Sequence, residues 1–177
     1  MSEKLNIVMA QLNLLVGDID GNTERIISAA KRAEVEFAAD VVVFPELALT
    51  GYPPEDLLLR PSLKLRVEKA LQHILQESID PILVIGFPES TGEAVYNSLL
   101  IAQRGEIVGE YRKQCLPNYQ VFDERRYFAA GDRACTLDLK GTRIAFTICE
   151  DLWEDEPARQ AKNAGAQMLV NINASPF

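Results

Sequence analysis

Hydrophobic positions along the chain form two kinds of pattern. Short continuous runs predict buried strands, and stripes that recur every three or four residues predict amphipathic helices. The predicted strands cover residues 5–11, 41–44, 81–87, 95–104, 106–112, 136–139, 143–148 and 168–172. The predicted helices cover residues 23–38, 63–76 and 157–165. Strands that alternate with helices and then follow one another in hairpins indicate an α/β fold with a mixed sheet.

Capping and turn residues predict where several of these elements end. Asn22 is expected to cap the first helix, and Pro88 is expected to close the strand at 81–87. Gly105 and the pair Lys140-Gly141 are expected to form hairpin turns. The stretch 114–132 remains a long loop, and long irregular loops in compact domains are often functional.

Three predicted strands lead directly to a reactive polar residue. The run 41–44 is followed by Pro45 and Glu46, the strand at 106–112 by Lys113, and the run 144–148 by Cys149. Open α/β sheets commonly carry their chemistry at the carboxyl ends of strands. If these three ends lie at one edge of the fold, a carboxylate, an ammonium and a thiol converge.

Each of the three groups has a use in acyl transfer. An ionised thiol is a good nucleophile. A carboxylate can take its proton and return it to a leaving amine, while an ammonium can stabilise an oxyanion. The only histidine, His73, lies on the helix at 63–76, so a catalytic Cys149 would use a carboxylate as its base. The acids Glu150 and Asp151 would disfavour a thiolate if they point inward.

A structural interpretation of the same residues stays open at this point. Free cysteines are often small, buried and inert, and acids and lysines lie mostly at the surface. The pattern alone does not decide between an inert thiol and a nucleophile.

Composition and charge exclude several classes of protein. The chain has 177 residues, 47% of them hydrophobic and 25% charged, which suits one soluble domain with a substantial core. The net charge of −8 and the lack of a basic stripe argue against binding to nucleic acid or to an anionic membrane. Neither a signal peptide nor a membrane-spanning run is apparent, so a cytoplasmic location is expected. Three widely spaced cysteines indicate neither a disulfide framework nor a paired-cysteine metal site.

The segments around the three reactive residues resemble those of a known family. Residues 44–46, 111–113 and 148–151 resemble the Glu, Lys and Cys signatures of the carbon–nitrogen hydrolase (nitrilase) superfamily. The flanking segments resemble the glutaminase domain of the glutamine-dependent NAD⁺ synthetase family; they are 16–22, 49–58, 113–119, 121–128 and 171–177. The resemblance runs from Leu5 to Phe177.

The resemblance implies a role for each matching residue. Cys149 would attack the side-chain amide of L-glutamine and form a thioester, Glu46 would act as general base and then acid, and Lys113 would stabilise the oxyanion. Glu124 would support the lysine or take part in proton transfer. Four further residues would line the glutamine pocket: Tyr52, Tyr119, Trp153 and Ser175.

The resemblance also implies a fold and partners. It predicts an αββα sandwich with mixed sheets, in which residues 1–177 form one amidotransferase domain that is incomplete on its C-terminal side. The ammonia would serve a synthetase domain that uses ATP, Mg and deamido-NAD⁺ and whose Ser-Gly-Gly-x-Asp-Ser phosphate loop is not in this sequence. No cofactor or metal is expected in this segment, a homo-oligomer is expected, and the isolated segment is not expected to reach full turnover.

Three alternatives compete with this interpretation. The chain could be a stand-alone amidase of the same superfamily acting on another small amide. It could instead be a non-catalytic interaction domain in which Cys149 is structural. A metal site at Cys149, Glu150, Asp151 and Glu154 is the weakest alternative, because zinc sites usually contain more His or Cys ligands.

Overall fold

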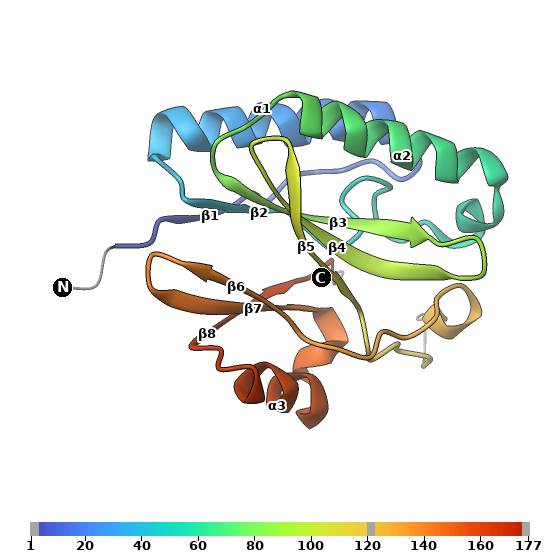
Figure 1. The fold of residues 1–177 in the computed structure, drawn as a ribbon. Coiled ribbons are helices and arrows are strands. Elements are labelled where there is room, and N and C mark those ends of the chain that lie inside the picture. The colour runs from blue at the N-terminus through green and yellow to red at the C-terminus, as the bar shows by residue number, and fades with distance from the viewer. Residues whose placement is uncertain (1–3, 120–122, 175–177) are drawn as a thin grey trace.

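Two β-sheets pack face to face between layers of helices (Figure 1). The computed structural model describes residues 4–119 and 123–174. The larger sheet contains, in spatial order, β1 (Ile7–Met9), β2 (Val41–Val43), β3 (Ile82–Ser90), β4 (Val95–Gln103) and β5 (Glu106–Arg112). The smaller sheet contains β6 (Cys135–Leu139), β7 (Thr142–Ile148) and β8 (Met168–Ile172).

Helices cover both outer faces of the sandwich. Helices α1 (Ile19–Phe37) and α2 (Pro61–Gln76) lie over the larger sheet, and α3 (Asp155–Asn163) lies on the far side of the smaller one (Figure 1). Three short 3₁₀ helices sit in the connections: η1 (Glu55–Leu59), η2 (Glu124–Arg126) and η3 (Cys149–Leu152). This arrangement confirms the predicted αββα sandwich.

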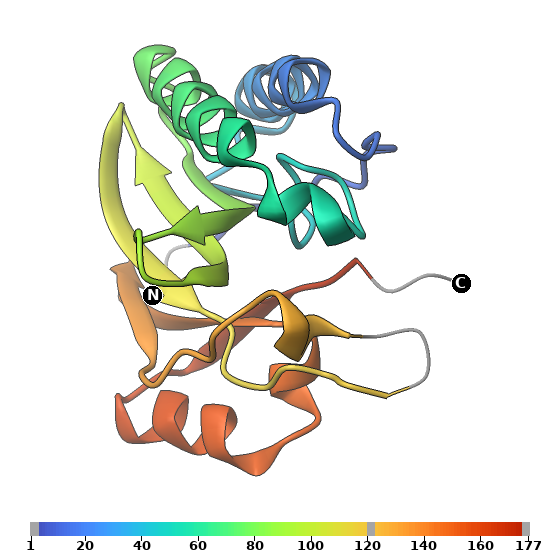
Figure 2. The ribbon, with the colours of Figure 1, turned by 90° about the vertical axis from the view of Figure 1, so that its right-hand side faces the viewer.

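Both sheets are mixed, as predicted. Strands β1, β2 and β3 are parallel, and α1 and α2 are the crossovers between them. Strands β3, β4 and β5 are antiparallel, as are β6 and β7, whereas β7 and β8 are parallel. Seen after a 90° turn, the loops that follow β2 and β5 and the end of β8 lie on the same side of the molecule (Figure 2).

Successive side chains of β2 point to opposite faces of the larger sheet and so contribute to two separate hydrophobic cores. Val42 packs into the core between the larger sheet and its helices, whereas Val41 and Val43 pack into the core between the two sheets. Successive side chains of a strand point to opposite faces, so a strand that is buried on both faces is a continuous apolar run. Ile144 and Phe146 of β7 close the inter-sheet core from the other side.

The predicted cap of the first helix was wrong. Helix α1 begins at Ile19, and the Asp18 carboxylate accepts the Gly21 N–H at 3.1 Å. Asn22 is buried one turn further on, where its amide binds the Leu15 backbone and donates to the Leu49 carbonyl at 3.2 Å. Asn22 therefore stabilises the loop segments around Leu15 and Leu49 instead of capping the helix.

The predicted end of the third strand was also wrong. Strand β3 continues through Pro88 to Ser90. Its pairing with β2 stops at Val84, so Pro88 has a hydrogen-bonded strand, β4, on one side only and a missing N–H is tolerated there. Helices α2 and α3 each begin two residues earlier than predicted.

Both predicted hairpin turns are confirmed. Arg104-Gly105 and Lys140-Gly141 all have positive φ, the conformation that a two-residue hairpin turn of type I′ requires. Within residues 4–119 and 123–174, no helix combines the length and the hydrophobicity needed to cross a bilayer.

Candidate active site

Glu46 lies in a tight turn at the end of β2. Its side chain is only 1% exposed. Gly86 of β3 passes so close to this turn that an added Cβ would lie 2.5 Å from the Pro45 oxygen and the Leu47 nitrogen. The fold therefore needs glycine at this position to keep Glu46 against the edge of the sheet.

Lys113 follows β5 and meets Glu46 in the interior. Its ammonium, which has no exposure to solvent, donates to Glu46 Oε1 at 2.9 Å and to Glu124 Oε1 at 2.8 Å. Asn97 Nδ2 donates to the same Glu46 oxygen at 2.8 Å. The structure thus brings together two of the three strand-end residues that the sequence singled out, together with Glu124.

Electrostatics keep the ammonium charged. Burial by itself would lower the pKa of Lys113, but the adjacent Glu46 and Glu124 carboxylates outweigh it and hold that pKa above its ordinary value. Burial raises the pKa of Glu124 to about 7, with Lys113 opposing the rise. One cation therefore lies between two carboxylates, Glu46 and Glu124.

Two buried acceptors in this cluster have no hydrogen-bond donor among the described residues. They are Glu124 Oε2 and Asn97 Oδ1. An unsatisfied buried acceptor is destabilising, by about 1–3 kcal/mol. Such atoms are suited to receive a proton or a substrate N–H.

Cys149 occupies a strained backbone position where β7 turns into η3. Its φ of +48° lies in the left-handed region, which is unfavourable for residues other than glycine. Strain of this kind persists where the surrounding structure enforces it, often at functional sites. The turn ends the buried run Ile144–Ile148 and leaves the thiol half-buried at the strand end.

Pairing between β7 and β8 brings the Cys149 turn towards Glu46. Ile148 pairs with Ile172. Just beyond Ile172, Asn173 accepts the Glu46 N–H at 3.4 Å, and the Ala174 N–H donates to Glu46 Oε2 at 3.2 Å.

Tyr52 lies within electrostatic reach of all these groups. Burial raises the pKa of its hydroxyl, the charges of Glu46, Glu124 and Cys149 raise it further, and Lys113 opposes them.

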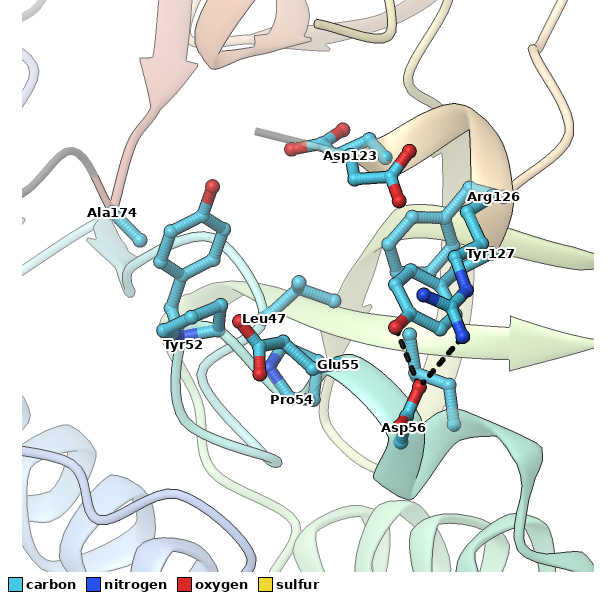
Figure 3. Close-up of a pocket in the computed structure, with 13 residues that line it drawn as sticks. Leu47, Tyr52, Pro54, Glu55, Asp56, Asp123, Arg126, Tyr127 and Ala174 are labelled. Atoms are coloured by element: carbon cyan, nitrogen blue, oxygen red, sulfur yellow. Dashed lines mark hydrogen bonds and ion pairs between the residues drawn. The ribbon is translucent and has the colours of Figure 1, made fainter. Parts of the chain in front are cut away.

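A cavity of about 510 Å³ opens beside this cluster (Figure 3). Tyr52 lies on one side, and Arg126 and Tyr127 lie on the opposite side, where both bind Asp56. Glu124 and Ala174, which also line the cavity, connect it to the buried ammonium and to Glu46. Its volume is typical of a small-molecule site.

The other predicted pocket residues lie elsewhere. The Tyr119 hydroxyl is 3.0 Å from both Glu150 oxygens and lines a neighbouring hollow of about 730 Å³. Trp153 is 76% exposed on the surface and lines neither of these two spaces. Ser175 falls outside the described residues.

Asp151 points inward, which is the condition under which it was expected to disfavour a thiolate. It is completely buried, and its carboxylate accepts hydrogen bonds from Tyr111 and from three backbone N–H groups. Sequence reasoning also missed Asn97, although a polar side chain inside the apolar run 95–104 was a signal. Among the described residues, no three His, Cys, Asp or Glu side chains are arranged to hold a metal.

Comparisons with known proteins point to one family. Residues 7–177 match the family described as carbon–nitrogen hydrolase. The glutamine-dependent NAD(+) synthetase of Xanthomonas campestris pv. campestris (strain 8004) is 47% identical over 176 residues, which cover 98% of this chain and 32% of that protein. The chain therefore spans about a third of the length of the curated relative.

Solved structures show the same fold. The glutamine-dependent NAD⁺ synthetase from Acinetobacter baumannii, in complex with ADP, superimposes with a TM-score of 0.92 at 38% identity, over 97% of this chain and 32% of that one. A mutant amidase from Nesterenkonia sp. AN1, showing the result of Michael addition of acrylamide at its active-site cysteine, superimposes with a TM-score of 0.87 at 25% identity. That match covers 98% of this chain and 68% of the amidase.

Proposed function

The chain belongs to the carbon–nitrogen hydrolase family, and we propose that it is the glutaminase part of a glutamine-dependent NAD⁺ synthetase. The observation that carries the proposal is the buried Lys113 ammonium between Glu46 and Glu124, beside the strained turn of Cys149. The names of the synthetases from Xanthomonas and Acinetobacter support glutamine as the substrate. The modified active-site cysteine of the Nesterenkonia amidase supports a cysteine nucleophile.

The first half of the reaction forms a thioester. Glu46 takes the proton from the Cys149 thiol as sulfur attacks the side-chain amide carbon of glutamine. The amide oxygen becomes an oxyanion that Lys113 stabilises. Glu46 then passes its proton to the amide nitrogen, the carbon–nitrogen bond breaks, and ammonia leaves a γ-glutamyl thioester.

The second half releases glutamate. Water gives a proton to Glu46 and attacks the thioester carbon, again through an oxyanion near Lys113. The carbon–sulfur bond breaks, and the thiolate recovers its proton from Glu46. Every group ends as it began, with glutamine and water converted to glutamate and ammonia.

The hydrogen bonds on Glu46 suit both proton transfers. Oε1 accepts from Lys113 and Asn97, and Oε2 accepts only the Ala174 N–H among the described residues. A carboxylate oxygen has about two acceptor sites, so Oε2 keeps room for the thiol or for water. In this proposal Glu124 supports Lys113 or takes part in proton transfer.

The cavity beside Tyr52 is proposed as the glutamine pocket. Tyr52 lines it, and Tyr119 would close it from the neighbouring hollow. Trp153 would contribute only once another part of the protein covers it, because its side chain is exposed. Ser175 completes the proposed set.

The fate of the ammonia belongs to the same proposal. We assign it to the ATP-dependent amidation of deamido-NAD⁺ in the rest of a full-length synthetase, where ATP and Mg would bind. The thioester chemistry itself draws on protein groups alone.

An amidase that acts on another small amide is the second candidate. It is supported by the Nesterenkonia amidase, of which the chain covers 68% rather than a third. The two candidates differ in substrate and share Cys149, Glu46 and Lys113. A kcat/KM for glutamine well above that for propionamide would favour the glutaminase.

Trapping the thioester tests the chemistry. The complete protein is mixed with glutamine, quenched in acid and examined by intact-mass and peptide mass spectrometry. We expect a γ-glutamyl adduct on Cys149 in the wild type, a lower yield in Glu46→Gln and none in Cys149→Ala. An adduct that persists in Cys149→Ala would overturn the assignment.

A further inference from the structure

Asp151 lies two residues after Cys149 and is completely buried. Its Oδ2 accepts the Tyr111 hydroxyl at 2.8 Å and the Ile148 N–H at 3.0 Å. Its Oδ1 accepts the Gln114 N–H at 3.0 Å and the Cys115 N–H at 2.8 Å. A carboxylate has about four acceptor sites, so these four donors saturate it.

The four donors come from the two segments that hold the reactive groups. Tyr111, Gln114 and Cys115 flank Lys113 on both sides, while Ile148 and Asp151 flank Cys149 on both sides. Strands β5 and β7 belong to different sheets, so no ladder of hydrogen bonds between them sets their register. The Asp151 carboxylate joins the two segments directly.

We propose that Asp151 is the positioning residue that fixes the Cys149 thiol relative to the Lys113 ammonium. The inference rests on the proposed function, because it takes those two groups to be the reacting pair. Asp151 does not act on substrate. Its acceptor sites are filled, so it does not take the thiol proton.

The expected size of the effect follows from geometry. A misplacement of about 1 Å in an active site lowers the rate by about 100-fold. Asp151→Asn preserves the size of the side chain but replaces one acceptor oxygen by a donor that faces backbone N–H groups. We therefore expect kcat on glutamine to fall between about tenfold and 100-fold, with KM nearly unchanged.

The experiment measures two quantities on the complete protein. The first is the pair of kinetic constants kcat and KM for glutamine, determined separately. The other is the rate at which iodoacetamide alkylates Cys149 at neutral pH, which depends on how close a cation lies to the thiol and makes no assumption about the substrate. Asp151→Asn should slow both the turnover and the alkylation. The loss of a nearby negative charge alone would favour the thiolate and speed the alkylation, so a slower alkylation reports that the thiol has moved away from the ammonium.

Asp40→Asn is the matched control. Asp40 also accepts a backbone N–H, that of Asn6 at 2.8 Å, and pairs with Lys140 at 2.7 Å. It precedes β2, whereas Glu46 follows β2, so it lies at the other end of that strand. We expect Asp40→Asn to lose stability but to keep wild-type kcat and alkylation rate.

The possible outcomes test the positioning role of Asp151 separately from the proposed glutamine substrate. Wild-type kcat and alkylation rate in Asp151→Asn, or losses matched by Asp40→Asn, would overturn the positioning role. A wild type that alkylates normally but does not hydrolyse glutamine would refute the proposed substrate, and the alkylation comparison would still decide the positioning role. If Asp151→Asn does not fold, Tyr111→Phe removes one donor of the four and should lower both rates by a smaller factor; unchanged rates would count against the inference.

Discussion

Two buried polar clusters meet at the segment around Lys113, and they use their hydrogen-bonding capacity differently. The first, here called the ammonium cluster, contains Glu46, Asn97, Lys113 and Glu124. The second, the Asp151 tie, is the Asp151 carboxylate with its four donors. The ammonium cluster leaves Glu124 Oε2 and Asn97 Oδ1 without donors among the described residues, whereas the Asp151 tie is saturated.

The number of unsatisfied acceptors distinguishes buried polar groups that can bind a proton or a ligand from those that only stabilise the fold. A saturated carboxylate stabilises one conformation and has nothing left to offer a ligand. A cluster with open acceptors is less stable than it could be, but a proton or a substrate can complete it. Burial alone does not distinguish the two, since both clusters are shielded from solvent.

The largest expected effect comes from removing the cation. Lys113→Met leaves two buried carboxylates without their partner, which should lower the free energy of unfolding by about 3–5 kcal/mol. The loss should be smaller at acidic pH, where protons neutralise the carboxylates. Urea denaturation at acidic and alkaline pH measures both quantities.

Lys140→Met is the control for that substitution. Lys140 pairs with Asp40, and both side chains are partly exposed, so its loss should lower the free energy of unfolding by at most about 1 kcal/mol. Equal losses in the two variants would contradict the distinction between a buried and a surface cation.

A smaller effect is expected for the pH dependence that Glu124 introduces. Its pKa is raised from 4.5 to about 7 in the folded protein, so its contribution to stability is fully present below about pH 4.5 and is lost as the pH rises through about 7. Relative to Glu124→Gln, the wild type should therefore lose up to about 3 kcal/mol of unfolding free energy across that range. Denaturation series on both proteins test this, and a constant difference between them would refute it.

The smallest effect is expected in the Asp151 tie. Tyr111→Phe removes one of four donors to a charged acceptor and should lower the free energy of unfolding by about 1.5 kcal/mol. Urea denaturation at neutral pH measures this loss. A loss as large as that of Lys113→Met would contradict the distinction between the two clusters.

Much of the site could be predicted because it sits where sequence patterns end. Apolar runs are strong local signals, and Glu46, Lys113 and Cys149 each follow one directly. The bounds predicted for the strands at 106–112 and 168–172 are those of β5 and β8, whereas β1 is shorter and β3 longer than predicted. Family resemblance added Glu124, whose loop has no periodic signal of its own.

The partners of these residues were harder to predict because they are distant in sequence. Asn97 lies 51 residues from the carboxylate it holds, and Asp151 lies 40 residues from Tyr111. No local sequence pattern indicates which buried polar groups will form hydrogen bonds with one another. For the same reason the sequence did not reveal that Asp151 accepts hydrogen bonds from two segments.

The Ala174 N–H on Glu46 has a consequence for biosynthesis. Its two partners are 128 residues apart, so the ribosome must make almost the whole segment before Glu46 receives this donor. The turn of Cys149 likewise follows β7, which pairs with β8, the last strand of the described residues. A nascent chain would therefore carry the thiol, the lysine and the acids for some time before the fold brings these groups together.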